Sequence, residues 1–485
     1  MKLLDIAIFI TEGLFKLLFG FLEFLISLLS GDGRKKEFNA QFETAGSSDL
    51  LSSFNHGFCL NGEKSLSAKL SFQNALVVAS TGGGKSSVVL IPTLFKIHGS
   101  CIVNDPSGEL FLKTAAYLKS KNYDVKVLNF ANASVSAGYN PILRAVTSSD
   151  INKVASMLVS NALGNSGNNK DFWAIQATSV IGMTIRLLKK QDQKYQNLFN
   201  VCQLITLINS EPKAMDKLFG KSADVLLWSD YKSFITYDDK VISGVLATCK
   251  AALSIFSSDE NVSKVTSFDT LSFDDFRKRP TVLFLNNSVA DARYYSIVSS
   301  IFFEQLFGYV MSKFPKKDEQ PIYFLLDEAS SLMLPTLPIT VANIRKFSSG
   351  ALILIQEMQQ LFSLYSNAAH GIISNCYSKM YLGAASPDTA RDLEGILGKF
   401  QFEDDQKNIK IKNLMEASDI RMLSENKGII IAGNHPPILA DLHPYYKDWK
   451  FSRYSEMPVP DITSDIPFED IPVLPLPNIS EKTDE

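Results

Sequence analysis

The sequence predicts an α/β protein with a mainly parallel β-sheet, an inserted all-α domain and an N-terminal helix that associates with a membrane. Three observations support this prediction. From about residue 39 onward, short apolar runs alternate with segments of helical periodicity, which is typical of a parallel sheet covered on both faces. Between about residues 150 and 275 the strand signals stop and helical periodicity continues. The first 30 residues are rich in Leu, Ile and Phe.

Eight short apolar segments are the predicted strands of the sheet. Helical spacing is expected between the second and third of them, over residues 109–120, and inside the insertion over residues 173–188 and 197–207. The predicted strands are residues 76–79, 101–105, 125–129, 281–285, 322–326, 351–355, 379–382 and 428–432.

Composition excludes several classes of protein. With 485 residues, 46% of them hydrophobic and 20% charged, the chain is long and apolar enough to fold around a buried core. The net charge of −3 argues against a surface that is basic throughout, although a local basic channel remains compatible. The five cysteines are widely scattered and form no CxxC pair, which argues against disulfides and structural zinc and favours a reducing compartment.

Residues 3–30 are the predicted membrane-associated helix. Its four charges fall on one narrow stripe of a helix, and the remaining surface is apolar. Such a helix can lie in the membrane interface, or it can span the bilayer with the stripe turned inward against other helices. A buried helix of a soluble domain is the third possibility, but core helices rarely have so wide an apolar arc. The charged residues are Asp5, Glu12, Lys16 and Glu23.

A glycine-rich segment after the first predicted strand has the pattern of a phosphate-binding loop. An apolar helix is expected directly after it, over residues 88–97, and this strand–loop–helix context is the one such a loop requires. Glycines let backbone N–H groups turn toward phosphate oxygens, and the helix N-terminus adds its dipole. Lys85 is expected to reach the β- and γ-phosphates and Ser86 to bind Mg²⁺, so ATP and Mg²⁺ are the expected cofactors. The expected nucleotide-binding residues are Ala79, Ser80, Thr81, Gly82, Gly83, Gly84, Lys85, Ser86 and Ser87.

Two acidic residues end the apolar run at 322–326. A strand next to that of the phosphate loop would bring Asp327 to the Mg²⁺ and Glu328 to the attacking water. The next predicted strand ends at Gln356, whose amide is a candidate contact for the γ-phosphate or this water. Arg345, just before that strand, is a candidate arginine finger across a subunit boundary. The predicted catalytic residues are Glu328, Lys85, Gln356 and Arg345, and the predicted metal ligands are Ser86 and Asp327.

Motifs along roughly residues 37–450 resemble those of the type IV coupling proteins of conjugation and type IV secretion, the TraG/TraD-type ATPases. Their order and spacing make the resemblance specific. The matching segments are Ala40–Phe42 with Gly57–Gly62, Asn104–Leu110, Gly138–Pro141, Lys170–Trp173, Asp327 with Glu328, Gln356–Leu361, Asn375 with Ser386–Ala390, and Pro444–Tyr446.

The resemblance implies a hexameric, RecA-like P-loop ATPase at the cytoplasmic face of the bacterial inner membrane. Members of the family pass a relaxase–DNA complex, or protein effectors, to a type IV secretion channel. The implied partners are therefore the relaxase, single-stranded DNA, channel components and further copies of the chain. Transfer of DNA is the favoured expectation, and handling of mainly protein effectors is the alternative. A ring can hold single-stranded DNA through a few Lys and Arg residues per subunit, so the mild net charge is compatible.

The chain departs from the family pattern at several places. Ala79 stands where the family has a first glycine, and Ser107 stands where it has a lysine. The sequence before Arg345 lacks the family's Gly-Arg-Gly run, so Arg391, which follows the segment Ser386–Ala390, is the second candidate for the finger. One charge-striped helix stands where the family has two transmembrane helices.

The expected domain organisation follows from these segments. Residues 457–485 contain six prolines and seven acidic residues against one lysine, which is typical of a disordered tail with polyproline II character. The expected divisions are 1–36, a membrane anchor or amphipathic helix with a basic linker; 37–150, the first part of the nucleotide-binding domain; 151–275, the all-α insertion; 276–456, the second part of the nucleotide-binding domain; and 457–485, the acidic tail.

Overall fold

The computed structural model describes residues 40–163, 172–287, 290–383, 386–403, 406–467 and 469–477. The helix predicted at residues 3–30 and the start of the Lys170–Trp173 motif lie outside these residues. Within them, no helix has the length and apolar character that crossing a bilayer would take.

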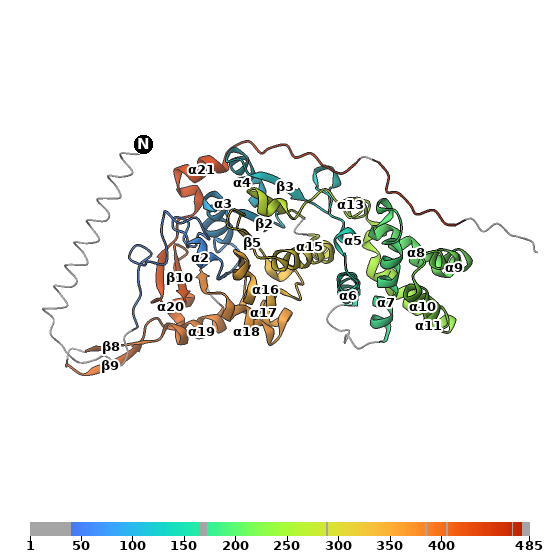
Figure 1. The fold of residues 1–485 in the computed structure, drawn as a ribbon. Coiled ribbons are helices and arrows are strands. Elements are labelled where there is room, and N and C mark those ends of the chain that lie inside the picture. The colour runs from blue at the N-terminus through green and yellow to red at the C-terminus, as the bar shows by residue number, and fades with distance from the viewer. Residues whose placement is uncertain are drawn as a thin grey trace, which may run out of the picture. The chain divides into compact units, whose positions relative to one another are not determined.

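A nine-stranded sheet forms the framework of the nucleotide-binding domain (Figure 1), in the order β11-β10-β7-β1-β6-β5-β2-β4-β3. The seven strands from β7 to β3 are parallel, and β10 and β11 add an antiparallel edge. All eight predicted strands are confirmed, and β11 was not predicted. The strands are β1 Ala75–Ala79, β2 Ser100–Asn104, β3 Asp124–Leu128, β4 Thr281–Leu285, β5 Ile322–Leu326, β6 Ser349–Ile355, β7 Ser378–Leu382, β10 Lys427–Ala432 and β11 Ile438–Asp441.

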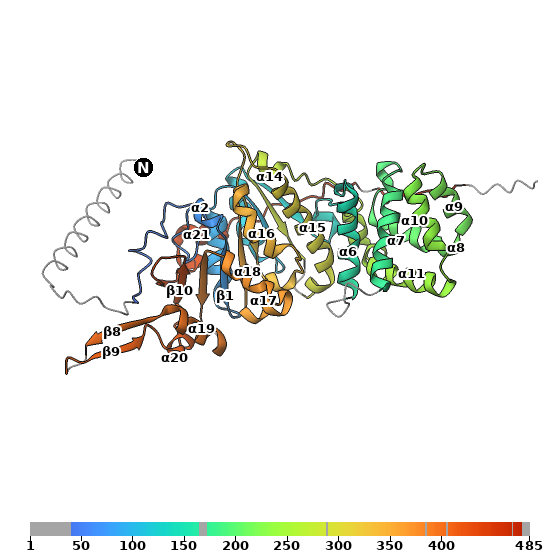
Figure 2. The same cartoon turned by 60° about the horizontal axis from the view of Figure 1, so that its bottom comes forward.

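Helices cover both faces of the sheet (Figures 1 and 2). Successive strand residues point to opposite faces, and β5 illustrates the two sides. Tyr323 belongs to the core that α3 and α4 complete, whereas Phe324 packs on Phe307 of α15 with ring centroids 4.9 Å apart. Every residue of β1, β2, β4, β5 and β6 is buried, which explains their uniformly apolar sequences. The helices around the sheet are α2 Ala68–Ser71, α3 Ile91–Lys96, α4 Glu109–Ser120, α15 Ala292–Ser312, α16 Leu337–Asn343, α17 Met358–Tyr365, α18 Ala368–Asn375, α19 Pro387–Leu397, α20 Ala417–Arg421 and α21 Trp449–Ser455.

Where the structure describes the chain between β3 and β4, its regular elements are all helices, as the sequence predicts. The predicted helices at 173–188 and 197–207 correspond to α7 and α8, and α7 packs against α6, α8, α10 and α11. The exact divisions at 150 and 275 remain predictions. The helices are α5 Pro141–Arg144, α6 Ser148–Leu163, α7 Phe172–Leu188, α8 Leu198–Ser210, α9 Pro212–Gly220, α10 Val225–Ile235, α11 Asp239–Leu253, α12 Ile255–Ser258, α13 Glu260–Val265 and α14 Asp275–Lys278.

A small second unit was not predicted. Residues 40–41 and 394–415 form a compact unit of their own. Its main element is an antiparallel hairpin of β8 Lys399–Glu403 and β9 Ile409–Asn413. The backbone N–H of Ala40 donates to the carbonyl oxygen of Lys399 (3.0 Å) and so attaches the incoming chain to β8.

Of the tail predicted at residues 457–485, the structure describes residues 457–467 and 469–477. These residues contain no helix or strand, but part of the segment is held against the domain. Ile466 and Leu474 are 5% and 8% exposed, and backbone groups near both make hydrogen bonds to distant parts of the chain. The proline-rich composition is compatible with the extended conformation of these residues, but it does not indicate the buried contacts of Ile466 and Leu474.

A buried asparagine fixes the start of β1 relative to its neighbours. Asn74 is 1% exposed and adopts a left-handed backbone conformation with φ +60°. Its side-chain oxygen accepts from the N–H of Ala351 in β6 (2.9 Å). Its amide nitrogen donates to the carbonyl oxygens of Val341 (2.8 Å) and Asn375 (3.1 Å). One side chain thus connects β1 and β6 to α16 and α18.

We expect Asn74→Ala to lower the free energy of unfolding by at least ~3 kcal/mol. The substitution leaves one N–H and two carbonyl groups without their hydrogen-bond partner, and each unsatisfied buried group costs ~1–3 kcal/mol. Asn122→Ala is the matched control. Asn122 also has a positive φ (+63°) but is exposed, so its replacement should cost only the left-handed backbone penalty of ~1–2 kcal/mol. Urea unfolding followed by circular dichroism measures the stability of both variants. Equal losses of stability would contradict the role that we assign to the side-chain hydrogen bonds of Asn74.

Candidate active site

The predicted site residues converge on one edge of the sheet, where parallel strands end. The sequence led us to expect the strand with the two acids beside the strand of the phosphate loop, and that expectation is wrong. β6 lies between β1 and β5 and pairs in parallel with both. Apolar strand sequences do not encode their neighbours, so strand order was open to error. As a result Gln356, at the end of β6, lies between the loop and the acids.

The loop after β1 has the backbone conformation that its glycines allow. Gly82 and Gly84 adopt positive φ angles of +77° and +91°, a region that other residues rarely occupy. Lys85 then opens a single π-helical turn, η1 (Lys85–Leu90), which continues into α3. The N–H of Val88 donates to the carbonyl oxygen of Gly84 (2.8 Å). Short π-helical turns often mark functional sites, and this one positions Lys85 and the two serines after it.

Four of the predicted residues form one contact cluster. The ammonium of Lys85 lies 3.5 Å from a carboxylate oxygen of Glu328. The amide of Gln356 donates to both oxygens of that carboxylate, at 3.0 and 3.1 Å. The hydroxyl of Thr81 donates to the side-chain oxygen of Gln356 (3.5 Å). The ends of β1, β5 and β6 are thereby linked through side chains.

The carboxylate of Glu328 is held in a strained and defined position. Its backbone is left-handed, with φ +49°, which costs energy in a residue other than glycine and occurs preferentially at functional sites. Asp327 accepts a hydrogen bond from the N–H of Glu328 (3.0 Å). The hydroxyl of Ser330 donates to the carboxylate of Glu328 (3.1 Å). Together with Gln356, these contacts orient the carboxylate, whose side chain remains 31% exposed.

Two further carboxyl groups lie behind this cluster, Asp105 fully buried and Asp327 half-buried. Burial raises the pKa of Asp327 to about 6, against the opposing effect of the Lys85 ammonium. Burial likewise raises the pKa of Asp105 to about 6, and the nearby Asp327 adds to this. Asp105 accepts hydrogen bonds from the N–H groups of Leu110 (3.3 Å) and Phe111 (2.8 Å) at the start of α4.

Sequence analysis gave no role to Asp105 or to its neighbour Asn104, although both belong to a quoted motif. The amide of Asn104 donates to the backbone oxygen of Asp327 (2.6 Å) and so joins the ends of β2 and β5. Their place at the end of a predicted parallel strand was the available signal, because the carboxyl ends of such strands share one edge. The residues of this edge therefore come from the ends of four neighbouring strands, β1, β6, β5 and β2.

The two serines after Lys85 lie in the first turn of η1. The hydroxyl of Ser87 donates to the carbonyl oxygen of Gly84 (3.4 Å). Among the described residues, no group of three or more His, Cys, Asp or Glu side chains could hold a metal ion. The assignment of Ser86 and Asp327 as metal ligands remains a prediction.

Neither candidate finger lies in this cluster. Arg345 is exposed in η6 (Ile344–Phe347), which precedes β6. Gln356 follows the other end of that seven-residue strand, and at ~3.3 Å per residue the strand separates the two by roughly 20 Å. Arg391, in α19, is exposed and pairs with Asp388 (3.2 Å). The chain therefore does not bring Arg345 to its own Lys85.

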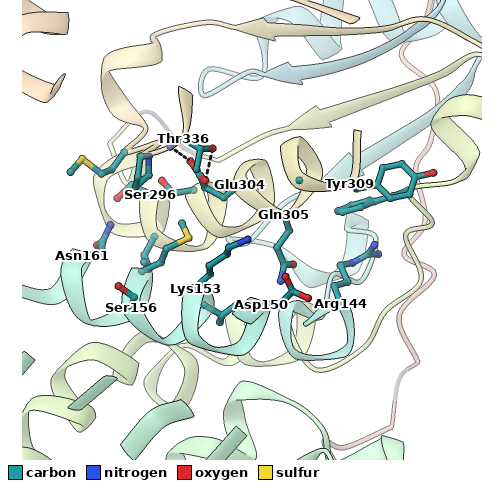
Figure 3. Close-up of a pocket in the computed structure, with 18 of the residues that line it drawn as sticks. Arg144, Asp150, Lys153, Ser156, Asn161, Ser296, Glu304, Gln305, Tyr309 and Thr336 are labelled. Atoms are coloured by element: carbon teal, nitrogen blue, oxygen red, sulfur yellow. Dashed lines mark hydrogen bonds between the residues drawn. The ribbon is translucent and has the colours of Figure 1, made fainter. Parts of the chain in front are cut away.

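A cleft of about 2290 Å³ extends from Glu328 between α6 and α15. Figure 3 shows Lys153 and Ser156 of α6 on one side and Glu304 and Gln305 of α15 on the other. Thr336 donates to Glu304 from its hydroxyl (2.6 Å) and from its N–H (2.9 Å). The cleft thus joins the acidic end of β5 to the helical insertion.

The raised pKa of Asp105 predicts a specific dependence of stability on pH. Its folded pKa of about 6 exceeds the ordinary 3.8, so the folded protein binds more protons than the unfolded chain between these values. The free energy of unfolding therefore falls as pH rises through this window. Asp105→Asn keeps an acceptor for α4 but cannot titrate. We expect its stability relative to the unaltered chain to rise by roughly 1–3 kcal/mol from pH 4 to pH 7.

Urea unfolding in EDTA at pH 4, 5, 6 and 7 measures this difference. Asp318→Asn, at an exposed position, is the control. Its free energy of unfolding should change with pH in the same way as that of the unaltered chain. A difference between Asp105→Asn and the unaltered chain that does not change with pH would contradict the raised pKa.

Comparisons with known proteins place these observations in a family. The sequence matches the family described as "Type IV secretory system Conjugative DNA transfer" over residues 49–467. Protein VirD4 of Agrobacterium fabrum (strain C58) is 24% identical over 418 residues, which cover 79% of this chain and 60% of VirD4. The probable conjugal transfer protein TraG of Sinorhizobium fredii is 21% identical over 393 residues, 75% of this chain and 60% of TraG. The chain spans about 60% of the length of these relatives.

Solved structures of the bacterial conjugative coupling protein TrwB resemble this fold. The form in complex with sulphate has a TM-score of 0.65 at 17% identity, and the match covers 85% of this chain and 96% of the solved chain, TrwBdeltaN70. The complex with the non-hydrolysable ATP analogue ADPNP has a TM-score of 0.66, again at 17% identity, with the same coverage. This likeness confirms the predicted RecA-like fold with a mainly parallel sheet. Because the family match covers most of the sequence, the chain belongs to the type IV secretory system conjugative DNA transfer family.

Proposed function

We propose that the chain is an ATP-hydrolysing coupling protein that recruits relaxase-bound single-stranded DNA and helps to move it into a type IV secretion channel. Membership of the conjugative DNA transfer family supports this proposal, as do the VirD4 and TraG relatives. The observation that carries it is the cluster of Lys85, Glu328 and Gln356 at the ends of neighbouring strands. We place the protein at the cytoplasmic face of the inner membrane, as a homo-hexamer anchored by residues 3–30.

ATP and Mg²⁺ are the proposed cofactors. TrwB has been solved in complex with ADPNP and in complex with ADP and Mg²⁺. In this chain the loop Ala79–Ser87 would hold the phosphates, and Ser86 and Asp327 would hold Mg²⁺. The donor set fits, because a carboxyl group with a pKa of about 6 is ionised at neutral pH and oxygen ligands suit this cation. Bound Mg²⁺ supplies positive charge that offsets the charge of the phosphates.

Glu328 is the proposed general base, because its partly exposed carboxylate can accept a proton from the attacking water. Gln356 holds both carboxylate oxygens, so it orients the base and stays within reach of the same water. The ammonium of Lys85, at the start of η1, can reach a bound phosphate. Arg345 is the proposed finger, and its distance from the cluster of its own chain supports action on a neighbouring subunit.

The test of this function is ATP hydrolysis by the full chain with and without single-stranded DNA. We expect DNA to stimulate hydrolysis. Lys85→Ala should weaken nucleotide binding, whereas Glu328→Gln should bind ATP and Mg²⁺ but hydrolyse ~10²–10⁴-fold more slowly, the usual contribution of a general base. Phosphate release and fluorescent-nucleotide titration measure the two effects.

Glu425→Gln, at an exposed position outside the cluster, is the control and should hydrolyse ATP normally. Undiminished hydrolysis by Glu328→Gln would exclude the proposed base. Hydrolysis that protein effectors stimulate and single-stranded DNA does not would overturn the DNA function in favour of a coupling ATPase that handles mainly protein effectors.

Mixed rings test Arg345. Arg345→Ala should retain nucleotide affinity but lose ~10³–10⁵-fold in turnover, as expected for a finger, while the neighbouring exposed Lys346→Ala should not. Lys85→Ala subunits keep the finger, and Arg345→Ala subunits keep the phosphate site. Mixtures should therefore regain activity where an intact site meets an intact Arg345. If mixed rings form but stay inactive, Arg345 is not the finger, and Arg391 becomes the candidate.

A further inference from the structure

The C-terminal segment follows the surface from α21 toward the helical insertion (Figure 1). Burial alternates along it, as in an extended chain with one face on the protein. Ile466 and Leu474 are 5% and 8% exposed, whereas Val473 is 57% exposed. Even-numbered residues therefore face the protein around both buried positions.

The first attachment is to the nucleotide-binding domain. The N–H of Ser464 donates to the carbonyl oxygen of Ser134 (3.0 Å). The hydroxyl of Ser464 donates to the carbonyl oxygen of Ser136 (2.7 Å). The same hydroxyl accepts from the N–H of Ile466 (3.0 Å). Ser134 and Ser136 belong to the segment that follows β3, and Ser136 is fully buried.

The second attachment is to α8 of the insertion. The side chain of Asn200 is fully buried. Its amide nitrogen donates to the carbonyl oxygen of Pro472 (2.8 Å), and its oxygen accepts from the N–H of Leu474 (2.9 Å). Asn197 accepts the other amide hydrogen (3.1 Å). The segment thus supplies two of the hydrogen bonds that a buried amide needs while the segment covers it.

The chemistry of the segment suits this site. The hydrogen bonds of Asn200 to residues 472 and 474 go to main-chain atoms, so they select an extended backbone and not a particular side chain. Pro467, Pro472, Pro475 and Pro477 favour extended conformations for themselves and for the residues before them. This preference lowers the entropy that docking costs. The one N–H that Asn200 needs belongs to Leu474, which is not a proline.

We propose that the insertion carries a binding site for an extended, proline-containing peptide, centred on Asn200, and that the chain's own residues 469–476 fill it, with residues 462–467 attached to the nucleotide-binding domain. The segment then acts as a strap from the nucleotide-binding domain to the insertion, the same two parts that flank the cleft of Figure 3. The strap limits how far the insertion can turn away from β5. Nothing in this proposal depends on ATP or DNA.

Hydrogen exchange of the full chain tests the strap. Leu474→Asp would bury an unpaired charge, so the segment should leave Asn200. The backbone amide of residue 474, which donates to Asn200, should then exchange at least ~10-fold faster. Val473→Asp is the matched control, because the adjacent side chain points to solvent, and it should keep slow exchange. Equal exchange in the two variants would overturn the proposal. Neither position lies in a folded helix or strand, so the variants leave the domain core intact.

Binding in trans tests the peptide site itself. A fluorescent synthetic peptide of residues 461–477 should bind the full-length Leu474→Asp chain at least ~10-fold more tightly than the unaltered chain, whose tethered segment competes at high effective concentration. Adding Asn200→Ala to the Leu474→Asp chain should abolish this binding. Adding Asn209→Ala, which changes an exposed asparagine of the same helix, should not. Absence of binding to the Leu474→Asp chain, or equal binding by the two double variants with unchanged thermal unfolding, would overturn the site.

Discussion

The parallel pairing of β6 with both β1 and β5 is the constraint on which the site depends. A slip of one residue would turn the side chains of β6 to the opposite face and move its end away from the loop. The hydrogen bonds of Asn74 to β6 and to two helices fix this register at one end of the strand. At the other end of β6, the hydrogen bonds of Gln356 to Glu328 are compatible with the same register. Fold and site are thus secured by the same strand.

Burial of charge gives the site its second organising feature. Asp105 and Asp327 lie deep enough that their ionised forms are disfavoured, whereas Glu328 is partly exposed and directly faces the ammonium of Lys85. Adjacent acids at the end of one strand therefore have different environments. Such a division suits the roles that we propose, a carboxyl that holds Mg²⁺ next to a carboxylate that faces the attacking water.

Much of the fold was predictable, because strands, the glycine loop and the terminal acids are local patterns. The order of strands was not, since it is decided by contacts between segments far apart in sequence. The hairpin was missed although Lys399–Glu403 and Ile409–Asn413 alternate apolar and polar residues, a signal that was available. The docked tail could not be predicted, because its partner Asn200 lies 272 residues before Pro472 and composition alone favours disorder.

Recognition of the tail through its backbone leaves its outward side chains free to serve another purpose. Asp461, Asp465, Glu469 and Asp470 are all exposed, while the atoms that Asn200 and the segment after β3 hold are main-chain atoms and one serine hydroxyl. The strap can therefore display a row of negative charge on the surface without giving up its attachment. Acidity and order, which composition sets against each other, coexist in this segment because its attachment uses main-chain atoms and one hydroxyl and leaves the carboxylates in solvent.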